Sequence, residues 1–90
     1  LQKPEKVIIA YSIVPQENLA KISARAIDIV VRKGLNLGET LRLAAEKCSG
    51  KGGGHNIAAG AQVPINELDA FIKTVDALVR EQLGRSDLER

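Results

Sequence analysis

The sequence predicts a small α/β domain with a mixed β-sheet of about three to five strands flanked by helices. Three observations lead to this class: two strand-like segments open the chain, two segments with helical spacing follow, and a short extended segment separates those helices. The predicted order is β-β-(α)-α-β-α. The 90 residues, of which 44% are hydrophobic and 27% charged, suit one domain with a thin core.

The first two strands are predicted at residues 7–13 and 19–26. The first is a continuous apolar and β-branched run, which is typical of a strand buried on both faces. The second alternates with period 2, so one face is apolar and the other polar. Turn-forming residues at 15–18 separate the two strands, which favours an antiparallel hairpin. The polar face of the second strand carries Lys21, Ser23 and Arg25.

The next segment, residues 27–33, allows two interpretations. Asp28 could cap a short helix that Gly34 ends, or the segment could be extended. A clearer signal follows, because Asn36 is a good N-cap and Glu39 lies three residues on in a capping-box arrangement. The helix opened there carries one apolar stripe of Leu37, Leu41, Ala44, Ala45 and Cys48, which assigns the cysteine to core packing.

The second half of the chain is predicted as loop, strand and helix. Residues 49–54 are expected to form a loop, and residues 58–63 a short strand that Pro64 ends. Asn66 is the predicted cap of the last helix, and Gly84 its C-terminal stop. We expect one domain over residues 1–90 with a frayed polar tail at 85–90. The last helix has apolar residues at helical spacing: Leu68, Phe71, Ile72, Val75, Leu78, Val79 and Leu83.

Composition excludes several classes of protein. No apolar run reaches the length of about 20 residues that a membrane span needs, and no secretory signal opens the chain. The one cysteine rules out an internal disulfide and suits a reducing compartment, so we expect a cytoplasmic location. The chain opens on Leu1 instead of methionine, which leads us to expect a fragment of a longer enzyme.

Charge is distributed unevenly, although the net charge is only +2. Residues 19–64 hold seven basic and three acidic residues, whereas residues 65–90 hold four basic and six acidic ones. The excess of positive charge favours an anionic partner for the first of these segments. An ordinary solvated surface is the alternative.

The most informative motif is the run GGGHNIAAG at residues 52–60, which places three glycines directly before the only histidine. Glycine backbones let N–H groups approach a ligand closely, and successive N–H groups can form a nest for an anion. Lys51 and His55 would complete a cradle for a phosphate or carboxylate at Gly52, Gly53 and Gly54. A flexible loop with a surface histidine is the alternative.

No complete catalytic centre is visible in the sequence. One histidine and one cysteine are too few for a metal site, so no metal ligand and no catalytic residue is predicted here. Ser23 has no nucleophile elbow that would make it a partner of His55 in catalysis. The glycine run is neither a Walker A motif nor a dinucleotide fingerprint. Arg25 could hold a phosphate through two hydrogen bonds, with an ion pair to a carboxylate as the alternative.

The motif GGGHNIAAG, together with Ser23-Ala24-Arg25, resembles the C-terminal DHH-associated domain of RecJ-like (DHH family) phosphoesterases, and most closely the archaeal RecJ-like exonuclease branch. The resemblance covers about residues 7–83. It implies that a separate N-terminal DHH domain holds the divalent metal, with manganese expected, and the catalytic Asp-His-His motif, which this sequence lacks. It also implies a substrate-binding site made of Ser23, Arg25, Gly52, Gly53, Gly54 and His55.

The resemblance gives two functional hypotheses. In the first, the chain grips the substrate for a metal-dependent exonuclease or oligonucleotide phosphoesterase and turns over nothing alone. Its expected partners are a single-stranded nucleic-acid end, a short oligonucleotide or a nucleotide, and the DHH domain of the same protein; no membrane is expected. In the second, it is a non-catalytic protein-interaction module of a replication or repair complex. Alanyl-tRNA synthetases have a related C-terminal domain. Because that domain lacks the GGGH run, we rank the resemblance to it below the resemblance to the phosphoesterases.

Overall fold

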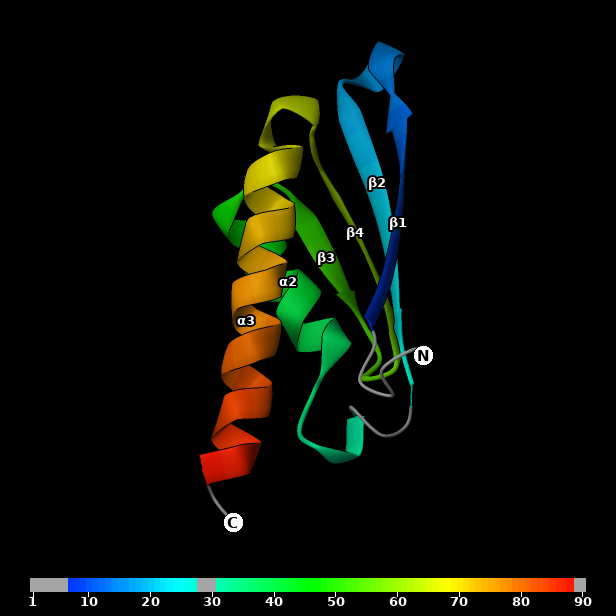
Figure 1. Cartoon of the computed structure of the whole chain (residues 1–90). Helices are drawn as coiled ribbons and strands as arrows, with labels where there is room; N and C mark the ends of the chain where they lie inside the picture. The colour runs from blue at the N-terminus through cyan, green and yellow to red at the C-terminus, as the bar shows by residue number, and fades with distance from the viewer. Residues whose placement is uncertain (1–6, 28–30, 89–90) are drawn as a thin grey trace, which may run out of the picture.

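The computed structural model describes residues 7–27 and 31–88, and it confirms an α/β fold (Figure 1). The sheet has four strands in the order β1-β2-β4-β3. All three pairings are antiparallel, so the described strands do not show the mixed directions that the sequence suggested. The strands are β1 (Val7–Val14), β2 (Leu19–Ala26), β3 (Lys51–Gly54) and β4 (Ala58–Pro64). Two short 3-10 turns, η1 (Pro15–Glu17) and η2 (Ile65–Glu67), and two helices, α2 (Leu37–Lys47) and α3 (Leu68–Leu88), complete the described elements.

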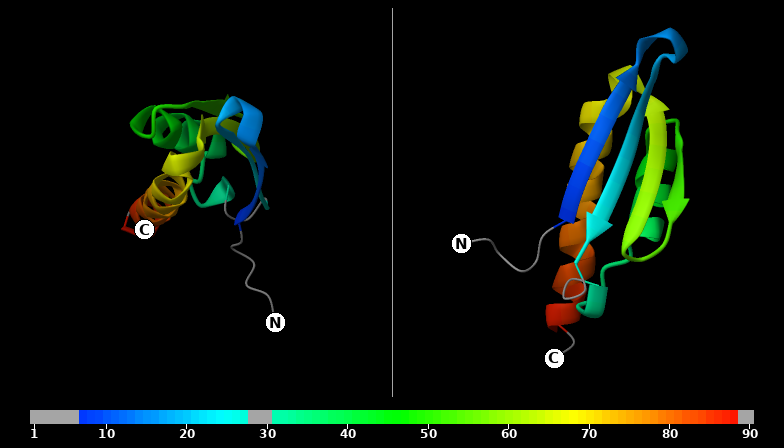
Figure 2. Two further views of the ribbon diagram at one scale, coloured as in Figure 1. Left: turned by 90° about the horizontal axis from the view of Figure 1, so that it is seen from above. Right: turned by 90° about the vertical axis from the view of Figure 1, so that its right-hand side faces the viewer.

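Both described helices lie on one side of the sheet, and none of the other described elements covers its second side (Figure 2). Helix α2 lies against β3 and β4, and α3 runs beside α2. The core is therefore a single layer between the sheet and the helices, as expected for a domain of this size. Its largest fully buried side chains are Phe71, Leu37, Leu41, Val63 and Val75.

Strand β2 follows its predicted alternation. Ala20, Ile22 and Ala24 are buried under the helices, while the residues between them are exposed. The period of two thus fixes which face of the sheet the helices cover, because a shift of one residue would expose the apolar set. The polar side chains of β2 consequently lie on the uncovered face, which we call the open face.

Strand β1 contradicts the prediction that it is buried on both faces. It is the edge strand of the sheet, and the exposed fractions of Ile8 and Tyr11 are 57% and 59%. Val7 and Ile9 still pack against the core, but Ile13 further along the same side is also exposed. The continuous apolar run correctly predicted a strand, but it did not predict that this strand lies at the edge of the sheet. Its residues are exposed because the two described helices pack on β2, β4 and β3 instead.

Helix α2 begins as predicted at Asn36, whose side-chain oxygen accepts a hydrogen bond of 3.2 Å from the Glu39 N–H. The reciprocal half of the capping box is absent. The Asn36 N–H instead donates to Oε1 of Gln82 in α3, at 2.9 Å. Gln82 also donates from Nε2 to Oγ1 of the fully buried Thr40, at 2.9 Å. One buried amide therefore ties α3 to the first turn of α2.

Three further expectations need correction or lie outside the described residues. Helix α3 follows the turn η2, which contains Asn66, so this asparagine is not its N-cap. The helix runs through Gly84 to Leu88, so the glycine does not end it and the predicted frayed tail is helical over 85–88. A helical turn ends at Gly34, whose φ is 109°, but Asp28 lies outside the described residues. Neither described helix is long and apolar enough to cross a membrane.

We predict that Gln82→Ala lowers the free energy of unfolding by about 1–3 kcal/mol, because it leaves the part-buried Asn36 N–H without its acceptor and the buried Thr40 hydroxyl without its donor. Urea denaturation followed by circular dichroism would measure the change. The control is Gln16→Ala at an exposed turn position, which should stay within about 0.5 kcal/mol of the wild type. Equal stability of the two variants would show that the amide does not tie the helices together.

Candidate functional site

The glycine run is a strand and not the loop that the sequence predicted. Residues 51–54 form β3 and pair with β4 in an antiparallel register, Gly53 opposite Gly60. A short turn joins the strands, closed by a 2.8 Å hydrogen bond from the His55 N–H to the Ala58 carbonyl. Glycine is a poor strand former, so propensity alone favoured a loop. The predicted anion nest of successive N–H groups is therefore not the geometry of this segment.

Two of these glycines sit where a side chain would not fit. A Cβ on Gly52 would lie 2.7 Å from the Leu41 carbonyl oxygen of α2, and one on Gly54 would lie 2.6 Å from the Cα of Ala59. Gly54 also has a φ of 146°, which favours glycine. On the helix side, a Cβ on Gly38 would clash with the Gly54 carbonyl. Close packing therefore explains two of the three glycines: the α2 backbone lies directly on Gly52, and residues of β4 crowd Gly54.

The hairpin turn is held by the start of α2. The Gly38 N–H donates to the His55 carbonyl at 2.9 Å, and the Leu37 N–H donates to the Asn56 carbonyl at 3.1 Å. On the other side, the Ala26 N–H donates to the Ile57 carbonyl at 3.0 Å. These bonds fix the backbone that carries His55. They also occupy two N–H groups of the first helical turn, which are then not available to bind an anion.

The strand register arranges the open face in three rows that cross the sheet. Residues directly opposite each other on antiparallel strands share a face, so each row can be followed from strand to strand. We name them the arginine row, with Ile8, Arg25 and Ala58 and, in the turn at its end, His55; the small-residue row, with Ala10, Ser23, Gly60 and Gly53; and the lysine row, with Ser12, Lys21, Gln62 and Lys51.

The register places three of the six predicted site residues on this face. Ser23 and Gly53 lie in the small-residue row and Arg25 lies in the arginine row, while His55 lies in the turn at the end of that row. Gly52 and Gly54 belong to the opposite side of β3, against α2. Sequence analysis did not single out Gln62, although its place in the alternation of β4, opposite both lysines, was a usable signal.

The open face is positively charged and has no acidic counterpart within the sheet. Lys21, Arg25 and Lys51 are the basic residues of the four strands, all three belong to the open face, and the strands contain no Asp or Glu. Over residues 7–27 and 31–88, none of the three makes an ion pair. The alternative in which a carboxylate pairs with Arg25 is therefore not observed. The ion pairs Arg42–Glu46 and Arg80–Asp76, each at 3.3 Å, lie on the helices instead.

His55 is exposed, and its imidazole makes no hydrogen bond to any described residue. The alternative of a histidine bonded to a local carbonyl is therefore not observed either. Its backbone is fixed while its side chain is free, which suits a group that donates to a ligand. The pKa of Cys48 is raised by burial and by the nearby Glu67 carboxylate, which disfavours a reactive thiolate.

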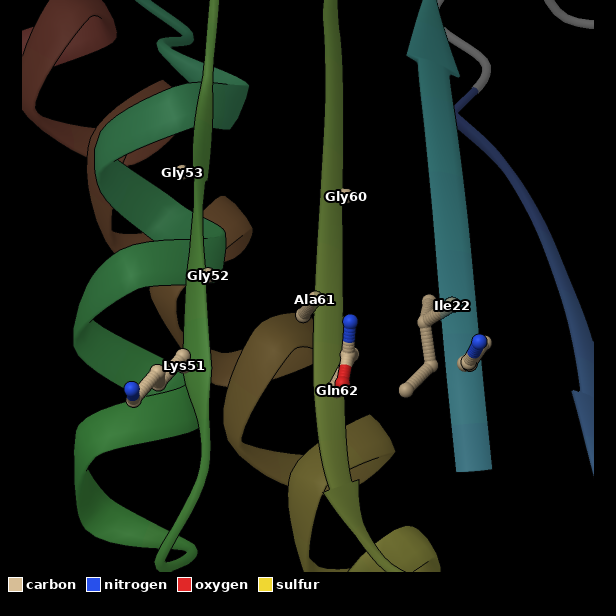
Figure 3. Close-up of a pocket in the computed structure, with 8 residues that line it drawn as sticks. Ile22, Lys51, Gly52, Gly53, Gly60, Ala61 and Gln62 are labelled. Carbon is tan, nitrogen blue, oxygen red and sulfur yellow. The ribbon is translucent and has the colours of Figure 1, made fainter. Parts of the chain in front are cut away.

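An open hollow of about 670 Å³ lies on this face, between the lysine row and the small-residue row (Figure 3). Its rim includes Lys21, Lys51 and Gln62, and its floor includes Gly53 and Gly60. The hollow is too open to enclose a small molecule alone. Within the part of the chain that the structure describes, no three His, Cys, Asp or Glu side chains are grouped so that they could hold a metal ion. The cationic side chains of this arrangement can bind an anion.

These features define an α/β domain with one basic sheet face. Residues 1–81 match the DHHA1 domain, so the chain belongs to the DHHA1 family. This agrees with the DHH-associated domain inferred from the glycine–histidine motif. DHHA1 domains are associated with nucleotide and nucleic-acid binding in DHH phosphoesterases.

This chain spans only a small part of the length of the similar proteins it matches. Over 81 residues it is 41% identical to the uncharacterized protein MJ0831 of Methanocaldococcus jannaschii, a match that spans 90% of the chain and 18% of that protein. Among solved structures it resembles the pGpG-specific phosphodiesterase PggH of Vibrio cholerae, with a TM-score of 0.63 and 21% identity. That match covers 84% of the chain and 24% of the phosphodiesterase.

A second solved structure with this fold is the C-Ala domain of alanyl-tRNA synthetase from Aquifex aeolicus. The TM-score is 0.62 at 19% identity, over 86% of the chain and 65% of that structure. At such identities both structures show a shared fold and no shared ligand. The archaeal RecJ-like branch stays a prediction.

We predict opposite effects of the same substitution at two glycines. Gly52→Ala should lower the free energy of unfolding by about 1–3 kcal/mol, because its methyl group would overlap the Leu41 carbonyl. Gly84→Ala has open space around it in α3 and should raise stability by about 0.5–1 kcal/mol. Urea denaturation of both variants measures the difference. A Gly52→Ala variant as stable as the wild type would contradict the close packing of α2 on β3.

Proposed function

We propose that this chain is the substrate-binding domain of a RecJ-like, metal-dependent exonuclease or oligonucleotide phosphoesterase. The observation that carries the proposal is the open face, on which Arg25 has no acidic partner among the described residues and lies in one row with His55. Such a face attracts a phosphate and leaves its donors free to bind it.

The arginine row provides the phosphate contacts. The Arg25 guanidinium can make two parallel hydrogen bonds to phosphate oxygens, which a lysine cannot reproduce. His55 donates from the fixed hairpin turn, and the Ser23 hydroxyl lies in the next row of the same face. Gly53 and Gly60 have no side chains, so a sugar or base can approach the sheet beside these donors.

The chemistry belongs to an N-terminal DHH domain in this proposal. That domain would hold the divalent metal, manganese in our expectation, and would close over the open face. The open hollow supports this division, because it needs a second surface to enclose a ligand. This chain matches only 18% of the length of MJ0831 and 24% of PggH, so proteins of that length have room for such a domain. We place the longer protein in the cytoplasm.

A second candidate function is a protein-interaction module of a replication or repair complex. The exposed side chains of Tyr11 and Ile13, which share the face of β1 opposite to Ile8, favour it, because exposed apolar patches mark interaction surfaces. The two candidates differ in which residues matter. Substitutions of Arg25 or His55 weaken oligonucleotide binding in the first, whereas substitutions of Tyr11 or Ile13 disrupt a protein complex in the second.

We predict that Arg25→Lys weakens binding of a fluorescein-labelled single-stranded oligonucleotide by about tenfold or more, because lysine cannot make the charged, bidentate interaction. His55→Ala should also weaken it. Fluorescence anisotropy gives the dissociation constants, and circular dichroism checks that each variant is folded. The matched control is Arg80→Gln, which removes an exposed arginine from α3, away from the open face, and should bind as the wild type does. Equal binding by all variants would refute the proposed site.

A further inference from the structure

The lysine row lies apart from the arginine row on the same face. Lys21 precedes Arg25 by four residues on β2, which corresponds to about 13 Å along an extended strand. Side chains stand roughly perpendicular to a sheet, so a single phosphate held by Arg25 does not reach the lysine row. The phosphate contacts proposed above therefore leave these lysines without a role.

The lysine row is built across three strands. Gln62 of β4 pairs with Lys21 on one side and with Lys51 on the other. Neighbouring strands are spaced by about 4.8 Å, so the amide lies between two cations whose Cα atoms are about 10 Å apart. All three side chains are exposed and line the same hollow, and none of them makes a hydrogen bond or ion pair with another described residue (Figure 3). In Figure 3 the Lys51 side chain extends away from Gln62, but a lysine side chain is flexible, and two lysines and an amide that line one hollow can meet one anionic group.

The small-residue row separates the two charged rows. It contains no side chain larger than the hydroxymethyl group of Ser23, and Gly60 and Gly53 are bare backbone. A Cβ built on Gly53 meets nothing within 4 Å, which shows free space above this position. A flexible polyanion can therefore lie across the sheet from one charged row to the other without meeting a bulky side chain.

We propose that the lysine row is a second phosphate subsite, and that the ligand is a single-stranded oligonucleotide long enough to place phosphates at both rows. This inference rests on the proposed function, because the arginine row supplies the first phosphate contact. It narrows the ligand from any nucleotide to one with several phosphates in a chain. A mononucleotide would occupy the arginine row alone.

The test compares ligand length and salt dependence. We expect the double variant Lys21→Gln/Lys51→Gln to bind a single-stranded hexanucleotide about tenfold more weakly, with binding of a mononucleotide unchanged. The slope of log K against log salt for the hexanucleotide should fall in magnitude by about 0.7, because the variant neutralises one phosphate fewer. Lys47→Gln/Lys73→Gln, which removes two exposed lysines from the helices, is the matched control. Lys21→Arg/Lys51→Arg should retain binding.

The outcomes separate the two levels of the proposal. If Lys21→Gln/Lys51→Gln bound the hexanucleotide with the same affinity and salt slope as the helix control, the second subsite would be overturned. An equal weakening for mononucleotide and hexanucleotide would also overturn it, because the lysines would then act on the first phosphate. In both cases weaker binding by Arg25→Lys would leave the proposed function standing. If the wild type bound neither ligand, the proposed function itself would fail.

Discussion

The direct contact between the backbone of α2 and strand β3 is the constraint on which the rest of this domain depends. Side chains usually separate a helix from a sheet, but here Gly38 of α2 and Gly52 of β3 remove the Cβ atoms that would intervene. The helix can then lie close enough for its first N–H groups to bond the hairpin carbonyls of His55 and Asn56. The glycines thus allow the helix to pack on the strand and, through these hydrogen bonds, fix the backbone of the hairpin turn.

This contact has a consequence for the opposite face of the sheet. Because both described helices are accommodated on one side, the other side keeps its polar residues uncovered, and the register aligns them in rows. The fixed turn holds His55 at the end of the row that contains Arg25. Without an acidic residue in the strands, the positive charges of this face have no partner within the sheet. The basic open face is thus a consequence of the packing on the far side of the sheet.

The sequence could predict those features that depend on local periodicity. Alternation in β2 identified the face that carries Ser23 and Arg25, and the asparagine before α2 identified its first turn. The features that it could not predict depend on contacts distant in the chain. The glycines of β3 have strand geometry because β4 and α2 surround them. The Asn36 N–H bonds Gln82, which is 46 residues away, and β1 is exposed because of its place at the edge.

The central claim is that the open face, and no other surface, binds a nucleic-acid phosphate chain. Chemical-shift mapping by NMR, with a single-stranded hexanucleotide added to the isotope-labelled chain, tests it most directly. The account predicts shifts in the amides of residues 21–25, 51–55 and 58–62, with the exposed side of α3 unchanged. Shifts confined to α3 or to β1, or no shifts at saturating ligand, would contradict it.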